Sequence, residues 1–131
     1  MAFKSTEKRR AYQREYMYKY WRAHRDDPIF MQHDREKSAR ARKRIKDSVF
    51  AVYGGYICAC CHEAEPIFLT LDHVDGGGKK HKRAIGKQGK NFYYWLKREG
   101  YPKGYQVLCH NCNHGRFLNG GTCPHKVNAL L

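Results

Sequence analysis

Apolar residues are scarce in this sequence. They make up 41% of its 131 residues, and the mean hydropathy is −0.86. No apolar run approaches the roughly 20 residues of a membrane-spanning helix, and the charged segment after Met1 lacks the apolar centre of a signal peptide. We therefore expect an intracellular protein that does not enter a membrane. Its small core should need a disulfide, a metal ion or a partner for stability.

Acidic residues are also few. Twelve Asp and Glu stand against 26 Lys and Arg, so the formal net charge is +14 and the isoelectric point is about 9.7. The excess is spread along the chain, with 15 basic against 7 acidic side chains in residues 1–50. A soluble domain of this size typically carries a net charge of about 2–8. The predicted partner is a polyanion, foremost a nucleic acid, either DNA or RNA. A membrane surface is disfavoured, because no basic stretch has a deep apolar face.

Residues 1–55 are predicted to form a basic helical extension. One helix is expected from Ser5 or Thr6 to about residue 25, where Asp26, Asp27 and Pro28 stop it. Tyrosines recur in it at every fourth position. A second helix is expected from about residue 34 to residue 53, ended by a pair of glycines. The aromatic side chains should face inward and the basic ones outward, toward phosphates. The candidate contacts in the second helix are Arg40, Arg42, Lys43 and Arg44.

Residues 56–131 have the pattern of short strands and turns, so the predicted class is α+β. Strands are expected over residues 68–71 and 105–108. A short helix is expected over residues 92–98, with Asn91 as its cap, and another from Cys112 or Asn113. Residues 79–90 contain no acid and are predicted to be a mobile loop that contacts phosphates. Its candidate contacts are Lys79, Lys80, Lys82 and Arg83.

Four cysteines are spaced as two metal-binding pairs. Cys58 and Cys61 form one CxxC, Cys109 and Cys112 form another, and 47 residues separate the pairs. Each such turn can direct two sulfurs at one ion, and two turns complete a tetrahedral zinc site with no open position for chemistry. We therefore predict one structural zinc ion that joins the two strands. In a reducing compartment, metal binding is a more frequent use of such pairs than disulfide formation.

The other two cysteines have no clear role from spacing. Cys60 lies inside the first pair and is interpreted as spare. Cys123 belongs to a Cys-Pro-His sequence that ends at His125. That short motif is either a substitute or an additional metal contact, or it has no metal role.

An Asp-His pair lies between the two CxxC motifs. Asp72 and His73 come at the end of the first predicted strand and are followed by glycines, and Asn113 comes directly after the last paired cysteine. Over about residues 56–118 this arrangement resembles the HNH, or His-Me finger, endonucleases. It is most similar to the phage recombination endonuclease VII type and related small phage HNH proteins. The resemblance implies a ββα-metal core bound to zinc.

The resemblance also implies roles for individual residues. His73 would be the general base, and Asp72 and Asn113 would hold a catalytic Mg²⁺ or Mn²⁺ ion, with His114 as an alternative to Asn113. These types suit the chemistry, since imidazole titrates near neutral pH and oxygen donors prefer hard cations. His81 could orient or protonate a phosphate oxygen, or could simply face solvent.

Two positions depart from the family pattern. Gly104 stands where most HNH motifs have an Asn that braces the histidine loop, and Asn91 is a candidate replacement. Arg116 stands where the endonuclease VII type has an acid, and it is predicted to bind phosphate instead.

The predicted function is endonuclease cleavage of DNA, as nicks or double-strand breaks, by a monomer or a homodimer. The alternative is a zinc-ribbon-like protein that binds nucleic acid without cutting it. The phage-like resemblance would place either one in a host cell. A thiol-redox role is disfavoured, because both CxxC pairs are matched to one metal ion.

Overall fold

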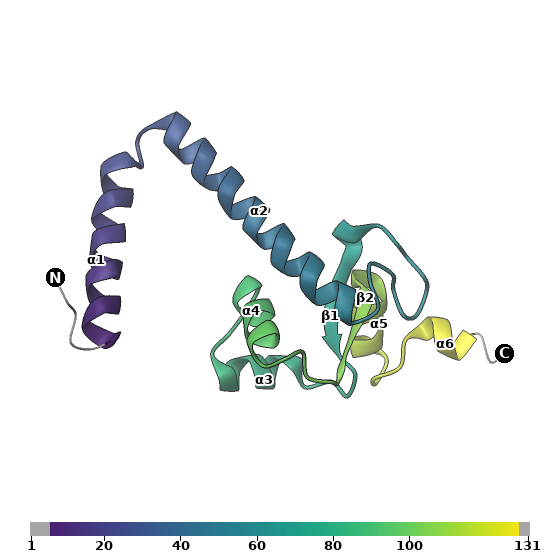
Figure 1. Cartoon of the computed structure of the whole chain (residues 1–131). Coiled ribbons are helices and arrows are strands. Elements are labelled where there is room, and N and C mark those ends of the chain that lie inside the picture. Colours follow the sequence, from purple (N-terminus) through teal and green to yellow (C-terminus); the bar gives the residue numbers. More distant parts are fainter. Residues whose placement is uncertain (1–5, 129–131) are drawn as a thin grey trace. The chain divides into compact units, whose positions relative to one another are not determined.

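The structure is a computed structural model that describes residues 6–128, with the side chains of residues 127 and 128 left undescribed. It confirms the α+β class, mostly helical with one two-stranded antiparallel sheet (Figure 1). The chain divides into two compact units, one ending at Ala41 and the other starting at Arg42. Helix α2 continues across that division. The sequence placed the boundary later, after residue 55, where the helical extension was expected to end.

The first unit contains helix α1, Thr6–His24, and the start of α2, Pro28–Val52. Helix α1 matches its prediction, but α2 begins six residues earlier than expected. The carboxylate of Asp27 accepts hydrogen bonds from the backbone N–H groups of Ile29 and Phe30, at 2.9 and 3.3 Å. Asp followed by Pro ends one helix and also caps the next one, because proline fits the first helical position.

The aromatic face of α1 is exposed, which corrects the expectation that it packs inward. The rings of Tyr12 and Tyr16 have centroids 6.4 Å apart, and those of Tyr16 and Tyr20 are 6.3 Å apart. Tyr12 and Tyr16 keep 55% and 56% of their surface accessible. None of the residues Thr6–His24 is buried. The four-residue spacing therefore produces a stack of rings along the helix instead of a buried seam.

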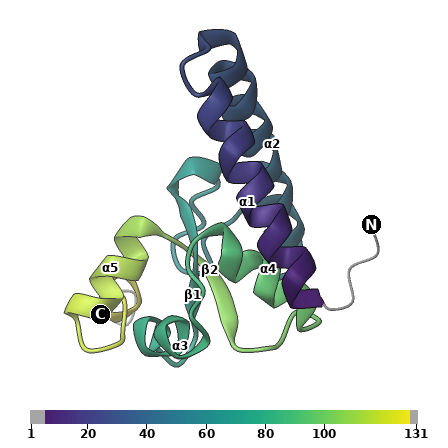
Figure 2. The ribbon, with the colours of Figure 1, turned by 90° about the vertical axis from the view of Figure 1, so that its left-hand side faces the viewer.

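The core of the second unit is small and draws on five elements. Val49 and Phe50 of α2 are fully buried, together with Phe92 and Leu96 of helix α4, Lys90–Arg98. The strands are β1, Leu69–His73, after a short 3₁₀ turn, Pro66–Phe68, and β2, Tyr105–Cys109. The sheet lies between α4 and helix α5, His110–Leu118 (Figure 2).

The sheet register determines which way the candidate residues point. Leu71 pairs with Val107, Asp72 with Gln106 and His73 with Tyr105. Successive strand residues face opposite sides of a sheet. His73 therefore shares the face of the buried Leu71, whereas Asp72 points to the opposite face.

The predicted basic loop is partly a helix. Residues Gly78–Ile85 form α3, bounded by Gly77 and Gly86 in the left-handed conformation, with φ of 76° and 65°. Gly77 and Gly86 are the boundaries of a helix, whereas the composition of residues 79–90 had indicated a loop. Asn91 lies inside α4, whose N-cap is Gly89, so the cap prediction was wrong by two residues.

The C-terminal part of the described chain follows the second cysteine pair. Helix α5 begins at His110, two residues earlier than predicted, and a short helix α6, Pro124–Asn128, follows it. Within residues 6–128, no helix has both the length and the apolar character required to cross a bilayer.

Candidate functional site

The four paired cysteines come together from three different segments. Cys58 and Cys61 lie in a turn in which the N–H of His62 donates to the carbonyl of Cys58, at 3.0 Å. Cys109 ends β2 and also caps α5, since the N–H of Cys112 donates to its sulfur at 3.4 Å. The strand-to-helix junction thus directs both sulfurs of the second pair to one side.

The geometry of these sulfurs matches a four-thiolate site. The four Sγ atoms of Cys58, Cys61, Cys109 and Cys112 all lie within 4.8 Å of one another. The sulfurs of Cys61 and Cys109 are 3.7 Å apart. Tetrahedral zinc with Zn–S bonds of about 2.3 Å requires sulfurs about 3.8 Å apart. The cluster could therefore hold a metal ion such as zinc, and it would join β2 and α5 to the turn before β1.

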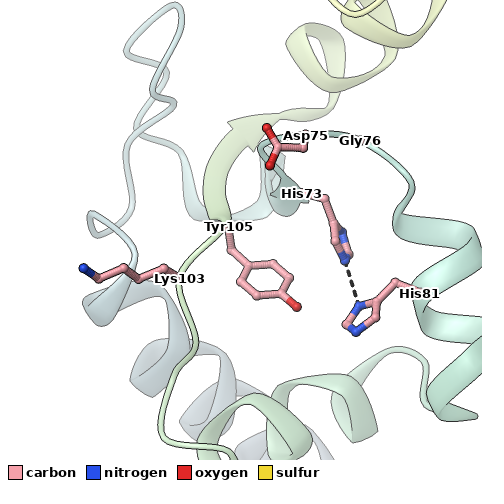
Figure 3. A pocket seen from close by; sticks show the side chains of 7 residues that line it. His73, Asp75, Gly76, His81, Lys103 and Tyr105 are labelled. Atoms are coloured by element: carbon pink, nitrogen blue, oxygen red, sulfur yellow. Dashed lines mark hydrogen bonds between the residues drawn. The ribbon is translucent and has the colours of Figure 1, made fainter.

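His73 lies at the end of β1 and lines an open cleft of about 240 Å³. One of its ring nitrogens, Nε2, lies 3.0 Å from Nδ1 of His81 on α3, so the two imidazoles share a hydrogen bond (Figure 3). The ring of Tyr105 packs against His73 with centroids 4.8 Å apart. The side chain of Lys103 points away from the two histidines (Figure 3). The cleft thus places a paired imidazole within reach of solvent.

The surroundings of His73 favour its neutral form. Burial lowers its pKa, and the nearby charges of His81 and Lys82 lower it further, while Asp72 opposes them. The ordinary pKa of histidine is about 6.5. At neutral pH the imidazole is therefore uncharged and carries a lone pair, which is the state that accepts a proton.

The backbone braces the loop around His73 where the family pattern would use an Asn side chain. The N–H of Val74 donates to the carbonyl of Gly104 at 2.9 Å, and Gly104 has a φ of 107°. A Cβ atom on Gly78 would lie 2.8 Å from Nδ1 of His73. Asn91, the predicted brace, is exposed. His81 contacts the imidazole, Gly78 leaves room for it, and Gly104 holds the backbone of the next residue.

Asp72 is engaged on the opposite face of the sheet. Its carboxylate accepts a hydrogen bond from the guanidinium of Arg116 at 2.7 Å, and the two side chains are only 19% and 18% exposed. The same guanidinium donates to the carbonyls of His73, Val74 and Gly121. Arg116 therefore ties the end of β1 to α5.

The structure brings some predicted site residues together and separates others. It pairs His73 with His81, and Asp72 with Arg116. Asn113 lies in α5 three residues before Arg116, and residues three apart lie on the same side of a helix. The basic residues of α3 flank His81 in sequence, and Lys82 also lies over the ring of Phe92, 5.0 Å from its centroid. On α2, Arg40 and Lys43 form ion pairs with Glu36 and Asp47.

No protein-family model, curated protein or solved structure matches this chain. The arrangement of its own residues must therefore carry the functional argument.

Sequence reasoning missed one feature of the site and left a second one open. The ion pair between Asp72 and Arg116 joins residues 44 positions apart, and no local pattern predicts such a pair. The approach of His125 to the cysteines was left open, and Nδ1 of His125 lies 3.3 Å from the sulfur of Cys112. The Cys-Pro-His sequence was the signal for this second feature.

Proposed function

We propose that the protein is a metal-dependent endonuclease of the HNH type that hydrolyses phosphodiester bonds in DNA. The observation that carries this proposal is the imidazole of His73 in an open cleft, paired with His81 at 3.0 Å. A general base must be deprotonated at working pH and reachable by the water that it activates. The lowered pKa of His73 favours the first condition, and its position in the lining of the cleft favours the second.

The remaining chemistry follows from the neighbouring groups. His73 accepts the proton of the attacking water, and its hydrogen bond to His81 keeps the ring in one orientation. Lys79 and Lys80 precede His81 on α3 and are exposed, so they can contact phosphates on either side of the cleaved bond. Such contacts position a nucleic acid strand without reading its sequence. These two lysines thus support binding of a duplex without regard to its sequence.

Asp72 and Asn113 are the proposed ligands of a Mg²⁺ or Mn²⁺ ion. A carboxylate and an amide oxygen are hard donors that suit either ion, and Asn113 lies on the side of α5 that contains the partner of Asp72. Because Asp72 and His73 point to opposite faces of the sheet, an ion held by Asp72 would reach the phosphate on which His73 acts, and neutralise charge on its leaving oxygen, only after the end of β1 rearranges. Because Arg116 already donates to Asp72, ion binding requires this guanidinium to shift.

A plasmid-nicking assay tests the proposal. The wild-type chain should relax supercoiled plasmid with Mg²⁺ or Mn²⁺ and should stop when EDTA is added. His73→Ala should reduce the rate by about 10²–10⁴-fold, the usual contribution of a positioned general base. His33→Ala is the matched control, because His33 is an exposed histidine of α2. Full activity in His73→Ala would refute the mechanism.

A second function, nucleic acid binding without cleavage, is favoured by the pairing of Asp72 with Arg116. An ion pair that is four-fifths buried already neutralises the carboxylate, so Asp72 needs no metal ion in this state. Arg116→Gln distinguishes the two functions. If Asp72 binds Mg²⁺, removal of the competing guanidinium should lower the Mg²⁺ concentration needed for cleavage. If the protein only binds nucleic acid, neither chain cleaves the plasmid at any Mg²⁺ concentration.

A further inference from the structure

We infer that the chain binds two metal ions, and that the second is held by Cys60, Cys112, Cys123 and His125, with Cys112 shared between both sites. The ligand atoms of these four residues all lie within 4.8 Å of one another. The two clusters together contain all six cysteines of the chain. All six are free thiols in the structure. This inference does not depend on the nuclease proposal.

One ion cannot use all of these donors. The two clusters contain seven ligand atoms, and structural zinc sites bind four. With a single ion at the paired cysteines, Cys60, Cys123 and His125 would remain beside it without a role. Soft sulfur and imidazole donors favour zinc at the second site as well as the first.

The distances around His125 match metal coordination. Its Nδ1 atom lies 3.3 Å from the sulfur of Cys112 and 3.6 Å from that of Cys123. A tetrahedral ion with Zn–S bonds of about 2.3 Å and Zn–N bonds of about 2.0–2.1 Å requires S···N separations of about 3.6 Å. The Nδ1 atom has either one hydrogen or one lone pair, so it can form one good hydrogen bond with a thiol and not two. A metal ion bound to Nδ1 and to both sulfurs would explain the two short distances together.

The segment that carries Cys123 and His125 is fitted closely to α5. A Cβ atom on Gly115 would lie 3.3 Å from Cδ of Pro124, so the missing side chain allows this approach. The side chain of Asn119 donates to the carbonyl of Thr122 at 2.9 Å, which closes the turn before Cys123. Cys123 itself is 5% exposed. The chain thus directs its last cysteine and histidine onto Cys112.

A second ion would also affect the neighbouring face of the sheet. Arg116 donates to the carbonyl of Gly121 at 2.9 Å, two residues before Cys123, and to the carboxylate of Asp72. An ion bound to Cys123 would fix the turn that holds this guanidinium. The second site therefore stabilises the α5–α6 connection and, through it, the end of β1.

Metal content measured by inductively coupled plasma mass spectrometry tests the inference. Wild-type protein purified with zinc should contain two ions per chain. Cys60→Ser and Cys123→Ser should each contain one, because three donors hold a structural ion poorly. His125→Gln should also lose the second ion. His110→Gln is the matched control and should keep two, because His110 is an exposed histidine on α5 outside both clusters.

A cobalt titration of the wild-type apoprotein makes the test independent of how the variants fold. The thiolate-to-cobalt absorption should increase up to two equivalents of Co²⁺ per chain. Saturation at one equivalent would overturn the inference, and so would one zinc ion in the wild type or two in Cys123→Ser. Each of these outcomes can be distinguished from a failure of the nuclease proposal, because the readout is metal content and not cleavage.

Discussion

His73 owes its proposed role to two kinds of neighbour that act in different ways. Phe92 and Tyr105 pack around its ring and exclude part of the solvent, which disfavours the charged imidazolium. His81 supplies a hydrogen bond and a second titratable group within 3.0 Å. A proton on one ring makes a proton on the other less favourable. Both effects lower the pKa of His73.

This coupling predicts a change in the pH profile of cleavage. Burial and then His81 lower the pKa of His73, and the active base is the neutral form, which is lost as the pH falls through that pKa. The acid limb of the wild-type profile should therefore lie below about pH 6.5. His81→Gln keeps a hydrogen-bonding side chain but removes the charge, so the limb should move to higher pH.

Lys82, on the same helix as His81, provides a graded control. Lys82 is the next contributor to the lowered pKa, so Lys82→Gln should shift the limb in the same direction by a smaller amount. Rates of plasmid nicking from pH 5 to 9 measure these shifts. A limb that stays in place in His81→Gln would show that His73 is not the titrating base.

Gly78 provides a second prediction at this scale. Its φ lies outside the left-handed region and its Cβ position would lie 2.8 Å from Nδ1 of His73, so alanine is acceptable to the backbone but displaces the imidazole. Gly78→Ala should lower the cleavage rate with unchanged zinc content. Lys80→Ala, two residues later on the same helix, should retain the wild-type position of His73. The ring signals of His73 in NMR spectra would report the displacement, and unchanged signals in Gly78→Ala would contradict it.

At the scale of elements, the sequence predicts what depends on local chemistry. The CxxC spacing alone identified the four paired cysteines, and the double glycine after residue 53 marked the end of α2. The start of α2 and the helical character of α3 were missed, because Asp27, Pro28 and Gly77 each have a second use as helix boundaries. The partner of Asp72 could not be predicted, since it depends on how β1 packs against α5.

The cap at Asp27 gives a prediction for α2. Loss of an N-cap side chain typically costs about 1 kcal/mol of helix stability, so Asp27→Ala should fray the first turn. Amide hydrogen exchange at residues 29–32 should become faster, and Asp27→Ser should restore part of the protection. Asp26→Ala removes a neighbouring carboxylate that does not bond to these amides and should leave their exchange unchanged. Equal protection in Asp27→Ala would show that α2 does not need the cap.

At the scale of the whole molecule, a metal ion held by the paired cysteines would compensate for a small apolar core and for a high net charge. Among the described residues, the buried side chains form one cluster that includes Cys58, Cys109, Cys112 and Cys123, so cysteines make up part of the core itself. A net charge of +14 adds self-repulsion. Bound metal opposes this, because folding and metal binding are one equilibrium when the site is absent from the unfolded chain. A bound polyanion would oppose it as well.

The charge of α3 leads to a prediction about salt. Each phosphate contact releases counterions, so the logarithm of the DNA affinity falls linearly with the logarithm of the salt concentration, by about 0.9 per contact on duplex DNA. Combining Lys79→Gln with Lys80→Gln should therefore reduce this slope by about 2, and should weaken binding to all sequences alike. Electrophoretic mobility shifts over a series of NaCl concentrations measure it. Lys97→Gln, an exposed lysine in the last turn of α4, removes a charge that does not belong to α3 and should leave the slope unchanged. If the double variant kept the wild-type slope, DNA would not lie along α3, and the cleft at His73 would lose the contacts that position its substrate.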